Sequence, residues 1–440
     1  MLDREGRATA PRFFRDTRND GRIMAQLSDD AFAFGGELMR IEEGLALVAD
    51  RVPAVTETEI VPLTHADGRV IAEELAAPID LPAFDNSAVD GYAVAHASLA
   101  ASGETVLPVA GRIAAGHGAG HAAGEGVAVR IFTGAPMPVG CDTVFMQEDV
   151  RLLDDGRVSL PAGLKPGANA RPKGEDIARG TPALPAGRRL DPRDVALLGA
   201  LGVAEVTVRR RPRVAVFSTG DEILEPGSPL APASLYDSNR FSLMAMLTRA
   251  GCEVTDLGIL KDEIGETGAR ILEAARGHDL VVTSGGVSTG EEDHVRAALT
   301  AHGSLAFWRL AIKPGRPVAM GVIEGTPFVG LPGNPVAVFV TWAHVLRPLV
   351  MKLAGSAALP VMPQTVVSDF AYKKKTGRRE YVRVSLELRD GRPVAVKYPV
   401  DGAGVVTSLT RTDGLVELAE ERTSLAPGEE VAFLDYRLIL

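Results

Sequence analysis

The feature that most constrains the fold is a regular alternation of short apolar runs and amphipathic stretches from residue 213 onward. Strand patterns at 213–218, 253–258 and 279–283 are separated by helical patterns, and a long helical pattern at 335–353 ends the series. Strands that alternate with helices predict βαβ units, in which parallel strands lie side by side in one sheet. Residues 212–357 are therefore predicted to form an α/β domain with a mainly parallel sheet.

The rest of the chain divides into stretches of different texture, and 440 residues are too many for one ordinary hydrophobic core. Residues 86–170 contain short apolar runs broken by Gly and Pro, which predicts a small inserted β domain. The flanking residues 34–85 and 171–211 are predicted to form one linking layer. Residues 358–440 alternate like strands with almost no helical pattern, which predicts a second β domain. Residues 1–33 are predicted to be a disordered tail.

Helical periodicity also occurs before the α/β segment. Apolar residues recur at three- and four-residue spacing over residues 34–48, which predicts an amphipathic helix. A second helix is predicted from residue 64 to beyond residue 75, and a short one at 195–201.

Charge and cysteine usage exclude several classes of partner. The formal charge of −10 argues against nucleic acid, because binding a phosphate backbone needs a net basic face. Cys141 and Cys252 lie far apart in the sequence, so neither a disulfide scaffold nor a thiolate metal site is expected. Because two distant cysteines without an expected disulfide are typical of a reducing compartment, the expected location is the cytoplasm. No membrane association is expected, because the longest apolar run, 336–346, is too short to span a bilayer.

Three loops of the predicted α/β domain follow the carboxyl ends of strands, where open parallel sheets bind ligands. They are residues 218–222 (STGDE), 284–290 (SGGVSTG) and 331–335 (LPGNP). Their small residues allow backbone N–H groups to approach a phosphate. Each loop by itself is equally compatible with an ordinary tight turn. Three loops at one edge of a sheet favour an anionic ligand.

Charged residues accompany these loops. Carboxylates near a phosphate site are explained by a divalent cation between them, although turn, cap or solvated-helix chemistry also accounts for acidic residues in such places. The acidic residues in question are Asp221, Glu222, Asp279, Glu291, Glu292 and Asp293. Lys313 and Arg316 lie in a proline-stiffened loop, KPGRP, that suits charge placement toward an anion or an ordinary hairpin.

Two catalytic signatures have to be weighed against this interpretation. No Gly-Lys dipeptide occurs, which excludes a Walker-type phosphate loop. Residues 286–290 (GVSTG) fit the Gly-x-Ser-x-Gly nucleophile elbow of serine hydrolases. The predicted strand ends near residue 283, several residues before Ser288, whereas an elbow serine follows its strand directly. The position of Ser288 therefore argues against a serine hydrolase, which is kept only as a minor alternative.

The ordered motifs of the chain resemble those of a known family. Residues 84–93 read FDNSAVDGYA, which is similar to the signature of molybdopterin molybdenumtransferases, the bacterial molybdenum insertases related to the gephyrin E domain. The likeness continues through IFTGAP at 131–136, KGEDI at 173–177, FSTGDE at 217–222, YDSN at 236–239, SGGVS at 284–288 and LPGNP at 331–335. It covers nearly everything from about residue 34 to the C-terminus.

The resemblance implies an architecture and an assembly. The expected fold is multidomain α/β plus β, with a parallel-sheet molybdopterin-binding α/β domain, an inserted small β domain, an elongated linking domain and a C-terminal β domain. The expected assembly is a homodimer whose active site is shared between subunits. In it, Asp90 and Thr133 of one subunit would face the partner subunit's Glu222, Asp279, Asp293 and Lys313.

The resemblance further implies an activity. The enzyme would insert molybdate into the dithiolene of adenylylated molybdopterin and release AMP. Asp90, Glu222, Asp279, Asp293 and Lys313 would be catalytic, and Glu222, Asp279 and Asp293 would hold Mg²⁺ and orient a water. Asp90 would handle protons as molybdate loses oxide. Substrate binding would fall to Thr133, Asp176, Ser218, Gly220, Ser284, Gly285, Gly286, Arg316, Pro332, Gly333, Pro335 and Arg383.

Two departures and two further alternatives accompany this expectation. Arg309 stands where some members have lysine, and Ala403 where some have serine, which puts a hydroxyl contact from the last domain in doubt. A molybdopterin carrier would bind the pterin without cleaving the adenylate. An adenylyltransferase would need the α/β domain but not its large flanking domains. A molybdopterin adenylyltransferase and apo-molybdoenzymes are the expected transient partners.

Overall fold

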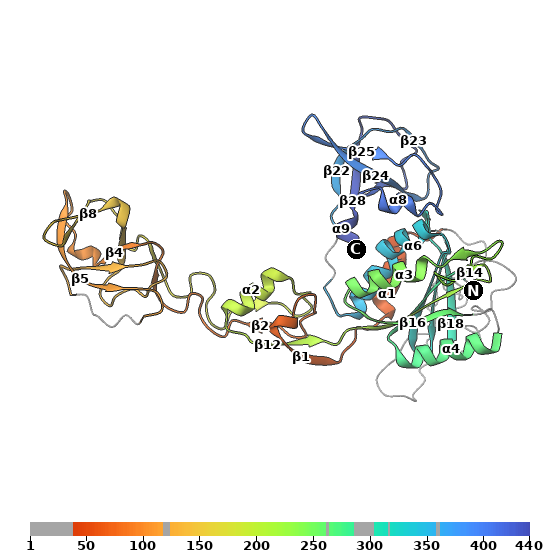
Figure 1. The fold of residues 1–440 in the computed structure, drawn as a ribbon, viewed down its shortest axis with the longest axis horizontal. Coiled ribbons are helices and arrows are strands. Elements are labelled where there is room, and N and C mark those ends of the chain that lie inside the picture. Colours follow the sequence, from red (N-terminus) through yellow and green to blue (C-terminus); the bar gives the residue numbers. More distant parts are fainter. Residues whose placement is uncertain (1–37, 118–123, 261–263, 286–302, 316, 358–360) are drawn as a thin grey trace, which may run out of the picture. The chain divides into compact units, whose positions relative to one another are not determined.

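The computed structural model divides the chain into two compact units (Figure 1). It describes residues 38–117, 124–260, 264–285, 303–315, 317–357 and 361–440. Unit 1 comprises Met1–Glu59, Gly68–Val70 and Arg209–Leu440, and unit 2 comprises Ile60–Asp67 and Ile71–Val208. The chain passes between the units within two paired strands, β1 (Thr58–Pro62) and β12 (Glu205–Arg209), and on either side of Gly68–Val70. The predicted tail and most of the loop predicted at 284–290 lie outside the described residues.

The α/β part of unit 1 is built on one six-stranded sheet. Its strand order is β16 (Glu253–Leu260), β13 (Arg213–Thr219), β17 (Leu280–Ser284), β21 (Thr326–Leu331), β20 (Pro317–Ile323) and β18 (Gly303–Arg309). The first four strands are parallel to one another, which confirms the predicted mainly parallel sheet. β20 pairs antiparallel with both of its neighbours, β21 and β18. The reversal occurs at Glu324 and Gly325, whose φ angles of 46° and 89° match a two-residue hairpin turn.

Helices cover both faces of this sheet because alternate strand residues point in opposite directions (Figure 1). In β13, Val214 and Val216 pack in the cluster that contains α3 (Asn239–Arg249), α1 (Ile41–Arg51) and α6 (Pro335–Thr341). Ala215 and Phe217 pack on the other face against α4 (Ile264–Gly277). All four side chains are fully buried, as expected for a sheet with helices on both faces.

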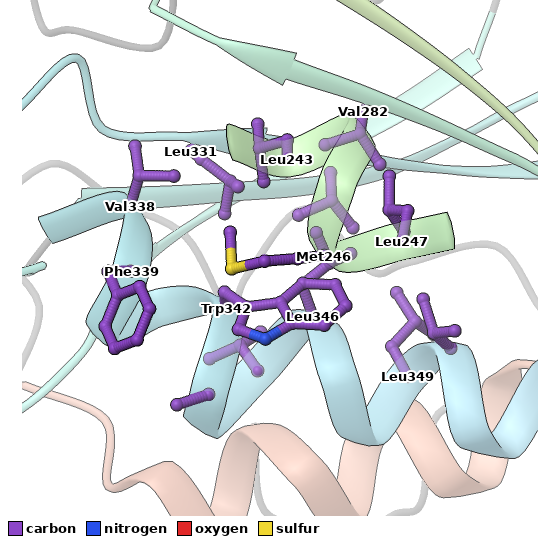
Figure 2. Packing of buried hydrophobic residues seen from close by; sticks show 14 of the residues in the cluster. Leu243, Met246, Leu247, Val282, Leu331, Val338, Phe339, Trp342, Leu346 and Leu349 are labelled. Carbon is purple, nitrogen blue, oxygen red and sulfur yellow. The ribbon is translucent and has the colours of Figure 1, made fainter. Parts of the chain in front are cut away.

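The larger of these clusters joins the sheet to its helices (Figure 2). Leu243 and Met246 of α3 lie near Val282 and Leu331 of the sheet and near Trp342. Trp342 begins a π-helical turn (Trp342–Leu346) that connects α6 to α7 (Arg347–Leu353). This continuous helical run, Pro335–Leu353, is long and apolar enough by composition to cross a membrane, but 72% of its most apolar window is buried inside the protein. It serves here as a core helix.

The C-terminal β domain, also in unit 1, is a closed sheet. Its strands are β24 (Arg379–Arg389), β25 (Arg392–Lys397), β22 (Gln364–Ser368), β28 (Glu430–Asp435) and β26 (Gly414–Leu418), and β26 pairs back with β24. Smaller elements are β23 (Tyr372–Lys373), β27 (Ser424–Leu425), α8 (Thr407–Thr410) and α9 (Tyr436–Ile439). The prediction of a β domain at the C-terminus is confirmed.

The α/β part and the C-terminal β domain are joined by backbone and side-chain contacts. The short strand β19 (Ile312–Lys313) pairs in parallel with β24, so that Lys313 lies opposite Glu380. The indole Nε1 of Trp342 donates to the carbonyl oxygen of Ile439 over 2.8 Å. Unit 1 therefore has one core that continues into its C-terminal domain.

Unit 2 contains a six-stranded sheet and several short ribbons. The sheet order is β7 (Thr143–Met146), β4 (Gly91–Val94), β6 (Ala128–Ile131), β5 (Thr105–Ile113), β9 (Arg157–Leu160) and β8 (Arg151–Leu152). The ribbons pair β2 (Leu75–Ala76) with β11 (Pro182–Leu184) and β3 (Asn86–Ser87) with β10 (Ala170–Arg171). The predicted short helix is α2 (Pro192–Ala200), which begins at a capping box formed by Asp191 and Asp194.

The predicted helix from residue 64 to beyond residue 75 is wrong. That region holds a single 3₁₀ turn, Leu63–His65, followed by a turn at Gly68 with a φ of 72°. The N–H groups of Ile71 and Ala72 donate to the carbonyl oxygens of Arg188 and Thr207, each over 3.0 Å. Hydrogen bonds to residues more than a hundred positions away therefore replace the local bonds of a helix. Tertiary contacts here outweigh the helical preference of the local sequence.

Truncating Leu243 tests the central packing of unit 1. The fully buried Leu243→Ala change is expected to lower the free energy of unfolding by about 2–5 kcal/mol, because it leaves a cavity against the sheet. Urea denaturation followed by tryptophan fluorescence measures this, since Trp308 and Trp342 both lie in unit 1. The control Leu388→Ala, at a side chain 78% exposed, is expected to stay within about 0.5 kcal/mol of wild type. Equal effects would contradict the packing described here.

His344 makes the stability of unit 1 sensitive to acid. Burial and the positive charge of Arg379 lower the pKa of His344 from 6.5 to about 4, although Glu42 opposes the shift. The unfolded chain therefore binds a proton that the folded chain does not, so stability is lost as pH falls from 6.5 toward 4.

We expect His344 to contribute a loss of about 3 kcal/mol across this window. The measurement is urea unfolding of wild type and His344→Gln at pH 7, 5.5 and 4. The stability advantage of wild type should shrink toward pH 4, and parallel pH curves would show that the buried imidazole is not the cause.

Candidate functional site

The three loops predicted to bind an anion begin at one edge of the sheet, and Ser284 and Gly285 are the described residues of the second loop. β13, β17 and β21 are neighbouring parallel strands, with Ser218 opposite Ser284 and Ser284 opposite Leu331. The three carboxyl ends therefore form one row, and the expectation that these loops share an edge is confirmed. Such an edge is where open α/β sheets bind ligands.

One side-chain amide ties two of these loops together. The Nδ2 of Asn239, the first residue of α3, donates to Ser284 Oγ over 2.9 Å and to the carbonyl oxygen of Gly333 over 2.7 Å. The next residue, Arg240, is buried and its Nε donates to Asp237 Oδ2 over 2.9 Å, which anchors the start of the helix. Asn239 belongs to the YDSN motif of the sequence, but the motif did not predict that its side chain hydrogen-bonds to two loops.

Glycine is required at two points of this edge. Gly220 has a φ of 136°, and a Cβ there would lie 2.7 Å from Glu222 Oε2. Gly285 has a φ of 88°, and its Cβ would lie 2.7 Å from the carbonyl oxygen of Thr219. A side chain at either position would be strained by the positive φ; at Gly220 it would displace the Glu222 carboxylate, and at Gly285 it would push against the backbone of Thr219.

The strand ends also carry buried hydroxyl groups that have no hydrogen-bond partner among the described residues. They are Ser218 Oγ, Thr219 Oγ1 and Thr283 Oγ1. Buried polar groups in proteins are normally paired, and Thr219, the one of these three residues that lines the cavity of unit 1, therefore indicates a place for a polar ligand or water.

A cavity of about 780 Å³ lies between these loops and the C-terminal β domain, within unit 1. Seven of the predicted site residues line it: Gly220, Glu222, Gly285, Lys313, Pro332, Gly333 and Arg383. Ser218 and Ser284 lie at the strand ends behind it, and Pro335 is the first residue of α6, next to the lining residue Asn334. The volume is typical of a site for a small molecule.

Three cationic side chains among the described residues line the cavity, each with its own partner. The Nζ of Lys313 donates to Glu380 Oε2 over 3.2 Å, and that of Lys397 lies 2.9 Å from Asp401 Oδ1. Arg383 is 9% exposed and donates to the carbonyl oxygen of Gly402 over 2.7 Å. An anionic ligand would therefore meet cations that are already held in place.

Several lining residues were missed by the sequence analysis. Tyr372, Tyr381, Tyr398 and Lys397 reach the cavity from the C-terminal β domain. Their strands were predicted only as a β pattern, and no motif marked these residues. The pairing of β19 with β24 brings them to the α/β domain, and such a long-range pairing has no local signal in the sequence.

The structure does not bring Asp279 to this cavity, so its prediction as a catalytic residue and metal ligand is corrected. Asp279 precedes β17 and lies at the amino end of the strand, whereas the loops follow the carboxyl ends. Its carboxylate accepts two hydrogen bonds from Arg210, over 2.9 and 3.0 Å, and one from the backbone N–H of Arg213 over 2.7 Å. Burial raises the pKa of Asp279, but these bonds outweigh it and the net pKa is lowered. The residue is a structural ion-pair partner.

Two of the three predicted metal ligands lie among the described residues. Of the three predicted ligands, Glu222 lines the cavity and Asp279 does not. Asp293, Gly286 and Arg316, with Ser288, lie outside the described residues. Within the described part of the chain, no group of three His, Cys, Asp or Glu side chains is arranged to hold a metal ion. Among the described residues, Glu222 and Asp401 are the carboxylates that line the cavity.

Two predicted residues of unit 2 contact each other directly. Asp90 Oδ1 accepts from the backbone N–H and from the hydroxyl of Thr133, each over 2.8 Å. Both bonds lower the pKa of Asp90, the backbone bond more than the hydroxyl bond, and the positive charge of Arg130 lowers it further. Asp90 is therefore an ionised carboxylate at neutral pH. Asp176, also in unit 2, is exposed, and its backbone N–H donates to Leu81 over 2.9 Å.

Family comparisons cover nearly the whole described chain. Three family profiles match it: the MoeA N-terminal region (domain I and II) over residues 39–202, a probable molybdopterin binding domain over 215–352, and the MoeA C-terminal region (domain IV) over 365–436. The first two meet near the passage from unit 2 into unit 1.

Whole-chain relatives agree with these matches. A molybdopterin molybdenumtransferase of Haemophilus influenzae is 37% identical over 405 residues, which cover 92% of this chain and 100% of the relative. One of Nostoc is 37% identical over 389 residues, 86% and 88% of the two chains. The crystal structure of the molybdopterin biosynthesis MoeA protein of Pyrococcus horikoshii aligns with a TM-score of 0.78 at 28% identity, over 91% of this chain and 100% of that one.

The ordered motifs, the multidomain α/β plus β fold and these whole-length similarities agree, and the chain belongs to the molybdopterin molybdenumtransferase family.

Proposed function

We propose that this protein is a molybdenum insertase that binds adenylylated molybdopterin in the cavity of unit 1, inserts molybdenum from molybdate into its dithiolene and releases AMP. One observation carries the proposal: three phosphate-compatible loops meet a triad of cations, Lys313, Arg383 and Lys397, across one cavity. The name of the relatives, molybdopterin molybdenumtransferase, supports the same reaction class.

The loops suit the phosphate part of the substrate. Gly220, Gly285 and Gly333 leave no side chain between the backbone and a ligand, so N–H groups can approach phosphate oxygens closely. The start of α6 beside Asn334 adds the positive end of a helix. Lys313 and Arg383, on the other wall, would balance the charge of the pyrophosphate or of molybdate.

Glu222 would orient the water that cleaves the phosphoanhydride. Cleavage consumes one water and yields AMP and the molybdopterin phosphate. Magnesium as a cofactor is part of the proposal, because Mg²⁺ takes one or two carboxylates and completes its shell with water and phosphate oxygens, which suits Glu222 and a bound pyrophosphate. When bound, the ion would polarise the phosphoanhydride.

Asp90 fits an ionised acceptor better than a proton donor. Its pKa is lowered by two hydrogen bonds from Thr133, so it carries no proton to give at neutral pH. We propose that it accepts hydrogen bonds or a proton from the substrate, and that Thr133 fixes its orientation. In this proposal Asp90 therefore accepts a proton or hydrogen bonds and does not donate a proton.

The assembly and location belong to the same proposal. Family resemblance supports a homodimer in which Asp90 and Thr133 of one subunit complete the site of the other, and Asp176 lies on the same unit as Asp90. A molybdopterin adenylyltransferase would deliver the substrate and an apo-molybdoenzyme would accept the product, in the cytoplasm. The carrier, adenylyltransferase and hydrolase alternatives have no feature of the described residues in their favour.

Anaerobic turnover of the full chain with adenylylated molybdopterin, molybdate and Mg²⁺ tests this function, with AMP release and activation of an apo-molybdoenzyme as readouts. Wild type is expected to release AMP only when molybdate is present. Glu222→Gln should lose roughly 100-fold in kcat/KM with its fold intact, because a preorganised charged group is removed from the site. Tight pterin binding without any AMP release would replace the insertase by a carrier.

The variant Asp279→Asn tests whether Asp279 supports the fold or takes part in turnover. The change removes the ion pair with Arg210, so the free energy of unfolding should fall by on the order of 2 kcal/mol. Turnover per folded molecule should remain near wild type, because the side chain lies at the opposite edge of the sheet. Loss of turnover equal to that of Glu222→Gln, with stability unchanged, would restore Asp279 to the site.

A further inference from the structure

Glu380 is a buried carboxylate with three donors and no assigned role. It lies in β24 and is 1% exposed. Its oxygens accept from Arg378 Nε over 2.7 Å, from the hydroxyl of Tyr372 over 2.8 Å and from Lys313 Nζ over 3.2 Å. A buried charge is tolerated when it is paired and hydrogen-bonded in this way.

Two of the three donors belong to the wall of the cavity. Lys313 and Tyr372 both line it, and the side chain of Lys313 is 51% exposed, so one side of its ammonium group meets Glu380 and the rest is available to a ligand. The ring of Tyr372 lies 5.9 Å from the Nζ of Lys397, a second lining cation. Glu380 therefore stands directly behind the charged wall.

Backbone pairing fixes the distance between Glu380 and Lys313. The two residues lie opposite each other in the parallel pair formed by β19 and β24, and the neighbouring pair is Ile312 with Arg379. Lys313 comes from the α/β part of unit 1, and Glu380 comes from the C-terminal β domain. The carboxylate therefore holds a lysine of the first part against a strand of the second.

We infer that Glu380 is a positioning residue for the substrate site: its buried carboxylate fixes Lys313 and Tyr372 in the orientation that receives the anionic part of the substrate. The inference rests on the proposed function, in which Lys313 meets a phosphate or molybdate oxygen. A lysine side chain loses considerable rotamer freedom when a ligand immobilises it. A lysine that is already held avoids this loss at the moment of binding.

The ionisation of Glu380 agrees with this role. Burial raises the pKa of its carboxyl group, but the hydrogen bonds from Tyr372, Lys313 and Arg378 more than offset burial, so the net pKa is lowered. The same carboxylate, after burial, is the main cause that raises the pKa of Tyr372. Tyr372 therefore remains a neutral phenol, and Lys313 keeps a charged partner.

The first test measures Lys313 itself and needs no turnover. The full chain is treated with limiting acetic anhydride at pH 8, and acylation rates of individual lysines are followed by mass spectrometry. In Glu380→Gln the amine of Lys313 loses its anchor, so its rate should rise severalfold relative to the exposed Lys375 in the same molecule. Glu387→Gln, an exposed glutamate of the same strand, is the matched control and should leave the ratio unchanged.

An unchanged Lys313 ratio in Glu380→Gln would overturn the inference. Glu380→Asp keeps the charge but shortens the reach by one methylene, and it serves where the glutamine variant does not fold. It should raise the ratio in the same direction, and an unchanged ratio in a folded Glu380→Asp protein would be equally decisive against the inference.

The second test uses turnover to separate positioning from general support. Glu380→Gln should raise KM for adenylylated molybdopterin about tenfold, the equivalent of one charge-assisted hydrogen bond, with a smaller change in kcat. In a Lys313→Ala background the same change should add little to KM. A full additional effect there would show that Glu380 acts through the fold and would refute the inference. A wild-type protein without turnover would refute the proposed function, while the acylation ratio would still decide the role of Glu380.

Discussion

The parallel hydrogen-bonded register of β13, β17 and β21 is the constraint on which the site depends. It aligns Ser218, Ser284 and Leu331 in one row, so that three loops far apart in sequence begin at the same edge. Helices cover both faces of these strands, and every residue of the three strands except Arg213 is buried. The glycines and hydroxyls of the loops can then converge on one ligand. Without this alignment, each loop would be an ordinary turn.

Much of this arrangement could be predicted from sequence because it is periodic or local. The alternation of strands and helices predicted the sheet, and strand ends rich in Gly and Ser predicted its loop edge. Asp279 was grouped with the acidic residues near the loops and was given its catalytic role by the family resemblance, but it lies before its strand and not after it. The prediction of a second helix in the linking region was wrong because the N–H groups of Ile71 and Ala72 donate to segments more than a hundred residues away. Tyr372 and Lys397 were missed because their position depends on a long-range strand pairing.

The C-terminal β domain is a part of the site and of the core of unit 1. β19 extends its sheet with two residues of the α/β part, and the indole of Trp342 donates to Ile439 near the end of the chain. Tyr381, Leu415 and Tyr436 belong to the same hydrophobic cluster as Leu243 and Val282. The domain thus supplies one wall of the cavity from a rigid, closed sheet, which suits a site that has to hold charged groups at fixed distances.

The amide of Asn239 has a consequence for how the loop edge can move. Because one NH₂ group donates to both Ser284 Oγ and the Gly333 carbonyl, a shift of either residue away from α3 stretches a bond to Asn239. The two loops are therefore mechanically coupled through a single residue on α3. A ligand group that binds one loop changes the free energy of displacing the other, so the pair behaves as one receptor surface with two attachment points.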